Sequence, residues 1–209
     1  MRTRSRQNFS FTLVEVILAL TITAGACTAT AMLLNAVADA WHTNDGISDA
    51  VNTARNGMLR IRSYIEKARF LGNCNGTALL LWSQDRDKDY QIDYSEMILI
   101  RYQSATKKVE LVDIYFPPGT SQSDIDARNT HLTYADISGT SSVTTILNAD
   151  AYHRVRTLAE DVDQFSIGLD TSSPRARYVT LSLQVTRQGI SQNLVGVITP
   201  RSTAYYLLE

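Results

Sequence analysis

Residues 11–38 read FTLVEVILALTITAGACTATAMLLNAVA, and this stretch decides the fold class of the chain. From Val16 to Ala38 there are 23 residues without a charge. A helix of that length rises roughly 34 Å, at about 1.5 Å per residue, which is enough to cross the hydrocarbon core of a bilayer. Because a helix pairs its own backbone polar groups in lipid, the sequence predicts a membrane-spanning helix here.

The residues around this run indicate its orientation. Residues 1–10 contain three arginines and no acid. Basic residues stay on the cytoplasmic side of a membrane, so we expect a cytoplasmic N-terminus and an extracytoplasmic chain after Asp39. A cleaved secretory signal is the competing interpretation, but the apolar run is too long for one. A plain anchor leaves Glu15 unexplained, because an ionised carboxylate in the middle of a bilayer costs at least ~2.5 kcal/mol.

The segment SFTLVEV, residues 10–16, resembles the prepilin cleavage and methylation signal of type IV pilins and type II secretion pseudopilins. The resemblance implies that a prepilin peptidase cuts between Ser10 and Phe11 and methylates the new amino group. It also implies that Glu15 of a neighbouring subunit neutralises this amine, which supplies the partner that a buried carboxylate needs. The family normally has Gly where this chain has Ser10, so we expect slower processing.

A second helical pattern follows the apolar run. Its apolar residues recur at alternating steps of four and three, which places them in one stripe on a helix: Ile47, Val51, Ala54, Met58, Ile61, Ile65 and Ala68. The first proline is Pro117, so one helix from residue 11 to about residue 71 is allowed, with Gly72 and Asn73 as the stop. We expect the stripe to pack on a sheet.

The rest of the chain has strand character. Strands are predicted at residues 77–82, 96–102, 109–116, 163–169, 177–187 and 192–199, and the polar residues 120–149 are predicted to form a loop region with one short element. The fold class is therefore α+β, with a long N-terminal transmembrane helix continuing into a head where it packs on an antiparallel sheet, a pilin-like roll. The expected divisions are a leader at 1–10, a membrane or filament-core helix at 11–38, the head half of the helix at 39–71 and a β-rich head at 72–209.

Two departures from abundant pilins refine the resemblance. Major pilins commonly carry a proline near the position of Met32, and they close a C-terminal disulfide loop, whereas the head of this chain has the single cysteine Cys74. The chain is therefore most similar to minor pilins and to minor pseudopilins of the J type.

The resemblance implies a structural minor subunit of a type II secretion pseudopilus or a type IV pilus-like filament, acting by assembly into or priming of that filament. Its implied partners are other pilin or pseudopilin subunits, the prepilin peptidase and the bacterial inner membrane, which it crosses once with a periplasmic head. A secretion pseudopilus, a retractile pilus and a DNA-uptake filament all stay open.

The composition and the positions of the histidines argue against nucleic-acid binding and against enzymatic activity. A formal net charge of -1 provides no basic field for a phosphate backbone, so no nucleic-acid partner is expected. The three histidines lie in no constellation with catalytic spacing, so no enzymatic activity is expected.

One acidic segment does indicate a ligand. Residues 85–96 read DRDKDYQIDYSE and place oxygen donors at the offsets of an EF-hand calcium loop: Asp85, Asp87, Asp89, Gln91 through its carbonyl, Asp93 and Glu96. Tyr90 occupies the sixth position, where such loops normally need Gly. The segment is interpreted either as a calcium site or as a solvated hairpin tip. A calcium site would make the chain a membrane-anchored, calcium-dependent binding or adhesion module, the alternative to a filament subunit.

Overall fold

The computed structural model describes residues 12–86, 88–138, 142–173 and 176–200. The chain divides into two compact units, Met1–Asp45 and Gly46–Glu209, and the second is called the head below. Helix α1 has the bounds Leu13–Lys67 and so contributes residues to both units. The predicted leader, with Ser10 and Phe11, lies outside the described residues, as does Asp87.

In the first unit, the described residues form the N-terminal part of α1. Its large apolar side chains are exposed, and the helix is long and apolar enough to cross a membrane. The threonine hydroxyls in this part bond to carbonyls of the preceding turn, as Thr23 does to Ala19 at 2.7 Å and Thr28 to Ala24 at 2.8 Å. Because these hydroxyls have partners within the helix, they do not oppose an apolar environment.

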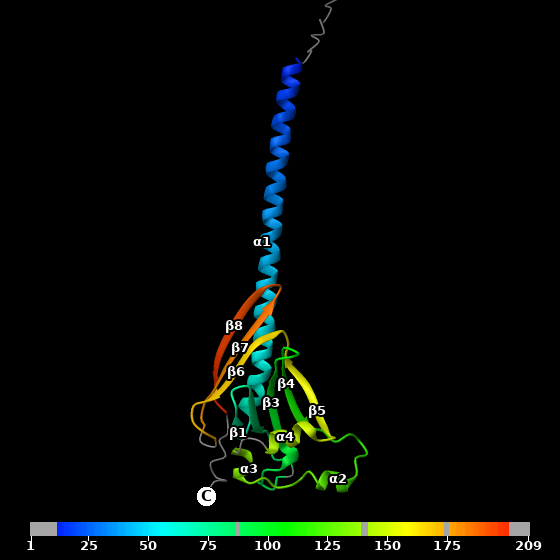
Figure 1. The fold of residues 1–209 in the computed structure, drawn as a ribbon, viewed down its shortest axis with the longest axis vertical. Coiled ribbons are helices and arrows are strands. Elements are labelled where there is room, and N and C mark those ends of the chain that lie inside the picture. Colours follow the sequence, from blue (N-terminus) through cyan, green and yellow to red (C-terminus); the bar gives the residue numbers. More distant parts are fainter. Residues whose placement is uncertain (1–11, 87, 139–141, 174–175, 201–209) are drawn as a thin grey trace, which may run out of the picture. The chain divides into compact units, whose positions relative to one another are not determined.

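The head contains two antiparallel sheets (Figure 1). The first has the order β1-β2-β3-β4-β5 and consists of Phe70–Cys74, Ala78–Trp82, Met97–Gln103, Lys108–Ile114 and His153–Ala159. The second has the order β6-β7-β8 and consists of Val162–Leu169, Val179–Arg187 and Ile190–Ile198. The 3₁₀ turn η1 (Tyr94–Glu96) precedes β3, and the short helices α2 (Gln122–Asp126), α3 (Tyr134–Ser138) and α4 (Ser142–Ala149) lie between β4 and β5. The predicted α+β class is confirmed.

The first sheet is covered on both faces. One face joins a core with α1 and the second sheet, to which β2 contributes Leu79 and Leu81. The other face joins a second core with η1, α3 and α4, to which β2 contributes Leu80 and Trp82. Burial on both faces explains why β2 is a continuous apolar run instead of an alternating one.

The buried face of α1 differs from the predicted stripe. In the head, α1 buries Gly46, Ala50, Ala54, Gly57, Ile61 and Ile65, while Ile47, Val51 and Met58 stay partly or largely exposed. A Cβ atom added at Gly57 would lie 2.6 Å from Cβ of Ala159, so the glycine allows β5 to approach the helix backbone. Close approach therefore brings Gly57 into the buried face, while Ala54, Ile61 and Ile65 are buried as the hydrophobicity pattern predicted.

Three other features also differ from the prediction. Helix α1 ends at Lys67, before the predicted residue 71, because Phe70 and Leu71 pair with Trp82 and Leu81 across β1 and β2. The polar region 120–149 contains three short helices where one short element was predicted, since Ile137, Val143 and Leu147 cover the second face of the sheet. The edge strand β5 was missed because Arg154 and Arg156 interrupt its apolar pattern.

Candidate functional site

Glu15 and Thr12 form a capping box at the start of α1. Glu15 Oε2 accepts hydrogen bonds from the backbone N–H and the hydroxyl of Thr12, both at 2.9 Å, and the Glu15 N–H donates to Thr12 Oγ1 at 3.3 Å. This reciprocal pairing satisfies amide donors that the first helical turn leaves open. The Thr-x-x-Glu spacing was visible in the sequence, and it gives Glu15 a local structural role beside the predicted role in assembly.

At the two ends of the acidic segment, Asp85 and Glu96 are turned into the protein. Asp85 Oδ2 accepts from Arg69 Nη1 at 2.9 Å, and the guanidinium of Arg69 stacks over the Trp82 ring at 5.4 Å. Glu96 Oε2 accepts from the Trp82 indole at 2.8 Å, and its Oε1 accepts from the Arg86 N–H. Both side chains are buried, and Asp85 Oδ1 has no hydrogen-bond partner within the described structure.

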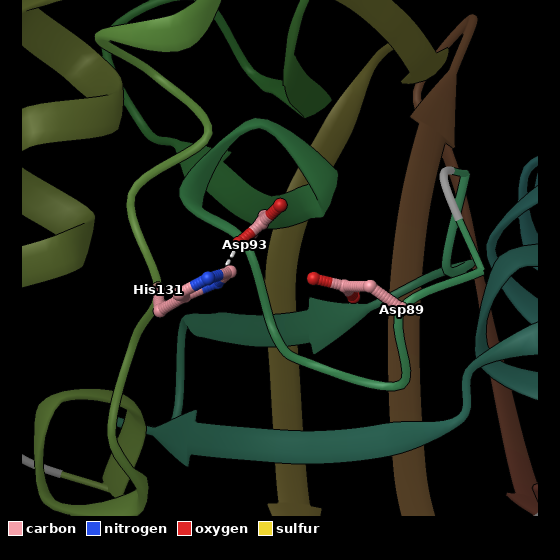
Figure 2. A group of neighbouring side chains, drawn as sticks. All are labelled: Asp89, Asp93 and His131. Carbon is pink, nitrogen blue, oxygen red and sulfur yellow. Dashed lines mark hydrogen bonds and ion pairs between the residues drawn. The ribbon is translucent and has the colours of Figure 1, made fainter.

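The middle of the segment contributes to a different group. Asp89, Asp93 and His131 place one ligand atom each within 4.8 Å of one another, and we call them the Asp-Asp-His cluster (Figure 2). His131 Nδ1 lies 2.6 Å from Oδ1 of Asp93, whose side chain is only 2% exposed. Asp89 and His131 are exposed to solvent.

Backbone pairing holds the Asp-Asp-His cluster together. Asp93 and His131 form an antiparallel bridge, flanked by Leu132 N–H to Ile92 O at 2.8 Å and Tyr94 N–H to Thr130 O at 3.1 Å. These bonds join the acidic segment to residues that follow α2. His131 lies 38 residues from Asp93 in the sequence, and no local pattern predicted this pairing.

The turn between Asp85 and Asp93 has the strained backbone that the sequence suggested. Tyr90, at the position where calcium loops normally have Gly, adopts φ 63°, and Lys88 adopts φ 64°. The Gln91 N–H donates to Asp89 Oδ1 at 2.8 Å, an Asx-type turn. Left-handed backbone at two non-glycine residues costs free energy, which the surrounding hydrogen bonds offset.

The six predicted ligands therefore fall into different environments. Asp89 and Asp93 meet in the Asp-Asp-His cluster, and Asp85 and Glu96 have protein partners outside it. Gln91 lies in the turn, where its N–H bonds to Asp89, and Asp87 lies outside the described residues. An imidazole and two carboxylates can chelate a divalent cation. Calcium prefers oxygen ligands alone, whereas imidazole suits zinc and other transition metals.

Comparison with known proteins adds no assignment. No protein-family model, no curated protein and no solved structure matches this chain.

Proposed function

We propose that this chain is a structural minor subunit of a filament of the type IV pilus or type II secretion pseudopilus kind. The observation that carries the proposal is the uncovered apolar surface of α1 at the start of the described chain. Leu13, Val14, Leu18 and Leu20 are each at least 60% exposed. An apolar surface of this extent needs lipid before assembly and neighbouring helices after it.

In this proposal the chain acts by assembly and does not turn over a substrate. A prepilin peptidase removes residues 1–10 at the cytoplasmic face and methylates the amine of Phe11. The cationic amine then pairs with Glu15 of a neighbouring subunit in the water-poor filament core, where each charge needs a partner. The capping box is compatible with this role, because a carboxylate oxygen can accept more than one hydrogen bond.

The α+β head supports a role in selecting neighbours. Helix α1 supplies one wall of its core, so the head and the anchoring helix are built from one continuous element. In a periplasmic location the head would contact other subunits.

Mass spectrometry of the mature N-terminus tests the proposal. The expected result is an N-methylated Phe11 as the first residue, and Ser10→Gly should increase the processed fraction because Gly is the family's usual residue before the cut. An intact Met1, or a cut near Ala38, would contradict the proposal. Expression without a prepilin peptidase is the matched control, and it should leave the leader attached.

A second function is favoured by the Asp-Asp-His cluster. In this alternative the chain is a membrane-anchored, extracytoplasmic binding or adhesion module that requires a divalent metal. Calcium is the ion that the sequence predicts, whereas the imidazole of His131 suits a transition metal better. The cluster supports metal binding because its three donor groups already lie within reach of one ion. Filament incorporation without any response to metal favours the first function, and a metal response without incorporation favours the second.

A further inference from the structure

Trp41 is the single Trp, Tyr or Phe residue among residues 12–45. It follows the apolar part of α1, and the residues after it, 42–45, read HTND and are polar. Its side chain is 72% exposed, whereas the other tryptophan of the chain, Trp82, is buried in the head. A bulky indole that the described residues leave uncovered indicates a contact surface outside the chain.

The position of Trp41 along α1 matches the thickness of a membrane. The uncharged run from Val16 to Ala38 has its midpoint at Cys27, which would lie at the centre of a bilayer that the run crosses. Trp41 follows Cys27 by 14 residues, which at about 1.5 Å per residue places it roughly 21 Å from that centre. The hydrocarbon core ends about 15 Å from the centre, and the headgroup region extends to about 20–22 Å. Trp41 therefore falls in the headgroup region.

The same placement suits the two acids that flank the run. Glu15 and Asp39 each lie 12 residues from Cys27, on opposite sides of it, and so roughly 18 Å from the bilayer centre. Both carboxylates reach the headgroup regions, where a charge costs less than in the hydrocarbon core. Moving α1 along its axis by one turn, about 5.4 Å, would take one of the two carboxylates into the core.

The surroundings of Trp41 favour lipid over a second protein as its partner. On the same face of α1, Val37 lies one turn before Trp41 and Asp45 lies one turn after it. The indole is therefore at a boundary between apolar and polar residues and not inside an apolar patch. Tryptophan is enriched at membrane–water interfaces because its ring is apolar and its N–H finds polar partners there.

We propose that Trp41 inserts its indole among the lipid headgroups at the C-terminal end of the membrane span, and that this contact marks where α1 leaves the bilayer. The inference rests on the membrane-spanning helix of the proposed function, and it adds the residue that ends the span. Phospholipid headgroups and the adjoining glycerol region are the partner.

Tryptophan fluorescence tests this contact in the full chain, reconstituted at a low protein-to-lipid ratio in phosphatidylcholine vesicles. Lipids brominated near the glycerol end of the acyl chain should quench Trp41 at least about twofold more strongly than lipids brominated near the terminal methyl group. Trp82→Phe leaves Trp41 as the only tryptophan. Because Trp82 belongs to the head core, the unaltered chain and Trp41→Phe are measured in parallel, and the quenching that Trp41→Phe loses is that of Trp41.

A spin label on Cys27, in a Cys74→Ala background, measures the depth of the span independently of Trp41. The label should be shielded from water-soluble relaxation agents and reached readily by oxygen, as expected at the bilayer centre. A label exposed to water would contradict both the membrane-spanning helix and the Trp41 contact.

Three results, each with the Cys27 label at the bilayer centre, would overturn the Trp41 contact alone. Quenching by aqueous acrylamide without quenching by brominated lipids would place the indole in water. Strongest quenching by the deep bromines would place it in the hydrocarbon core. Quenching by neither agent would place it against protein, such as a second copy of the chain.

Discussion

Trp82 donates its indole N–H to Oε2 of Glu96 at 2.8 Å, and both side chains are buried. Glu96 is the last residue of the acidic segment, where a calcium loop places its bidentate ligand. Its other oxygen accepts from the Arg86 N–H. The carboxylate therefore closes the base of the segment and connects it to β2.

Glu96→Ala should lower the free energy of unfolding by about 2–4 kcal/mol, because it leaves the buried indole N–H of Trp82 without its acceptor and removes the acceptor of the part-buried Arg86 N–H. Urea denaturation followed by tryptophan fluorescence measures this loss in the presence of EDTA. Glu96→Gln, which keeps one acceptor oxygen, should lose less. A loss below about 0.5 kcal/mol for the alanine variant would show that the Trp82 bond contributes little.

The Asp-Asp-His cluster predicts a choice of metal. Calorimetric titration of the full chain in micelles should show that Asp89→Asn weakens binding of either Ca²⁺ or Zn²⁺, because it removes a charged ligand. His131→Ala should weaken Zn²⁺ by about tenfold or more and leave Ca²⁺ unchanged, since imidazole is a poor ligand for calcium. His153→Ala is the matched control, as His153 lies outside the cluster. No heat with either ion would exclude a metal site at this position.

Gly57→Ala should destabilise the head by about 1–3 kcal/mol, because the added methyl group would lie 2.6 Å from Cβ of Ala159 and 3.4 Å from Leu183. Gly25→Ala is the control within the same helix, where an added Cβ meets no atom within 4 Å. It should be neutral or slightly stabilising, since Ala is the better helix former. Thermal unfolding of the two variants distinguishes them, and equal melting temperatures would refute the close-approach explanation.

Variants of Glu15 and Thr12 separate capping from assembly. Glu15→Gln keeps an oxygen that can accept from Thr12 but removes the charge, so the assembly role predicts that it fails to enter filaments. Thr12→Ala removes the hydroxyl partner and keeps the charge, so it should incorporate nearly normally. Incorporation is measured by cross-linking to neighbouring subunits. The reverse pattern, in which Gln assembles and the Thr12 variant does not, would assign Glu15 to capping alone.

The hydrogen bonds of Asp170 lead us to expect that the folded protein loses stability in acid. Its carboxylate accepts backbone N–H bonds from Tyr178 at 3.1 Å and Arg177 at 2.8 Å, which hold the pKa of Asp170 below its usual range. A carboxyl with a lower pKa in the folded state stabilises the fold above its unfolded pKa of about 4, and this contribution disappears as the pH falls through the folded pKa. Asp170→Asn should therefore flatten the fall in stability below about pH 4.

Melting temperatures measured from pH 6 down to about pH 2 test this expectation. Asp45→Asn is a suitable control, since no hydrogen bond or ion pair of Asp45 is found in the described structure. If the two variants have the same slope, the bonds to Arg177 and Tyr178 do not contribute to acid stability.

The local sequence pattern was enough to predict several helices and strands. The apolar run predicted the start of α1, alternation predicted β7, and aliphatic, β-branched and aromatic residues predicted β3 and β4 within a few positions. In each case, the element's own residues contain the signal, because side chains repeat with the period of the helix or strand. The acidic segment was also visible as a cluster of donors.

What the sequence determined by itself is therefore a long apolar helix followed by an antiparallel α+β head. Only the tertiary structure decided that Gly46 and Gly57 are buried while Ile47 is exposed and Met58 is only partly buried against the core, because close backbone approach depends on the neighbouring strand. It also decided that His131 joins Asp89 and Asp93, while Glu96 turns inward to Trp82. These pairings link residues from different parts of the fold. A contact between residues far apart in the sequence produces no periodic pattern of residue types, so it could not be predicted from the chain alone.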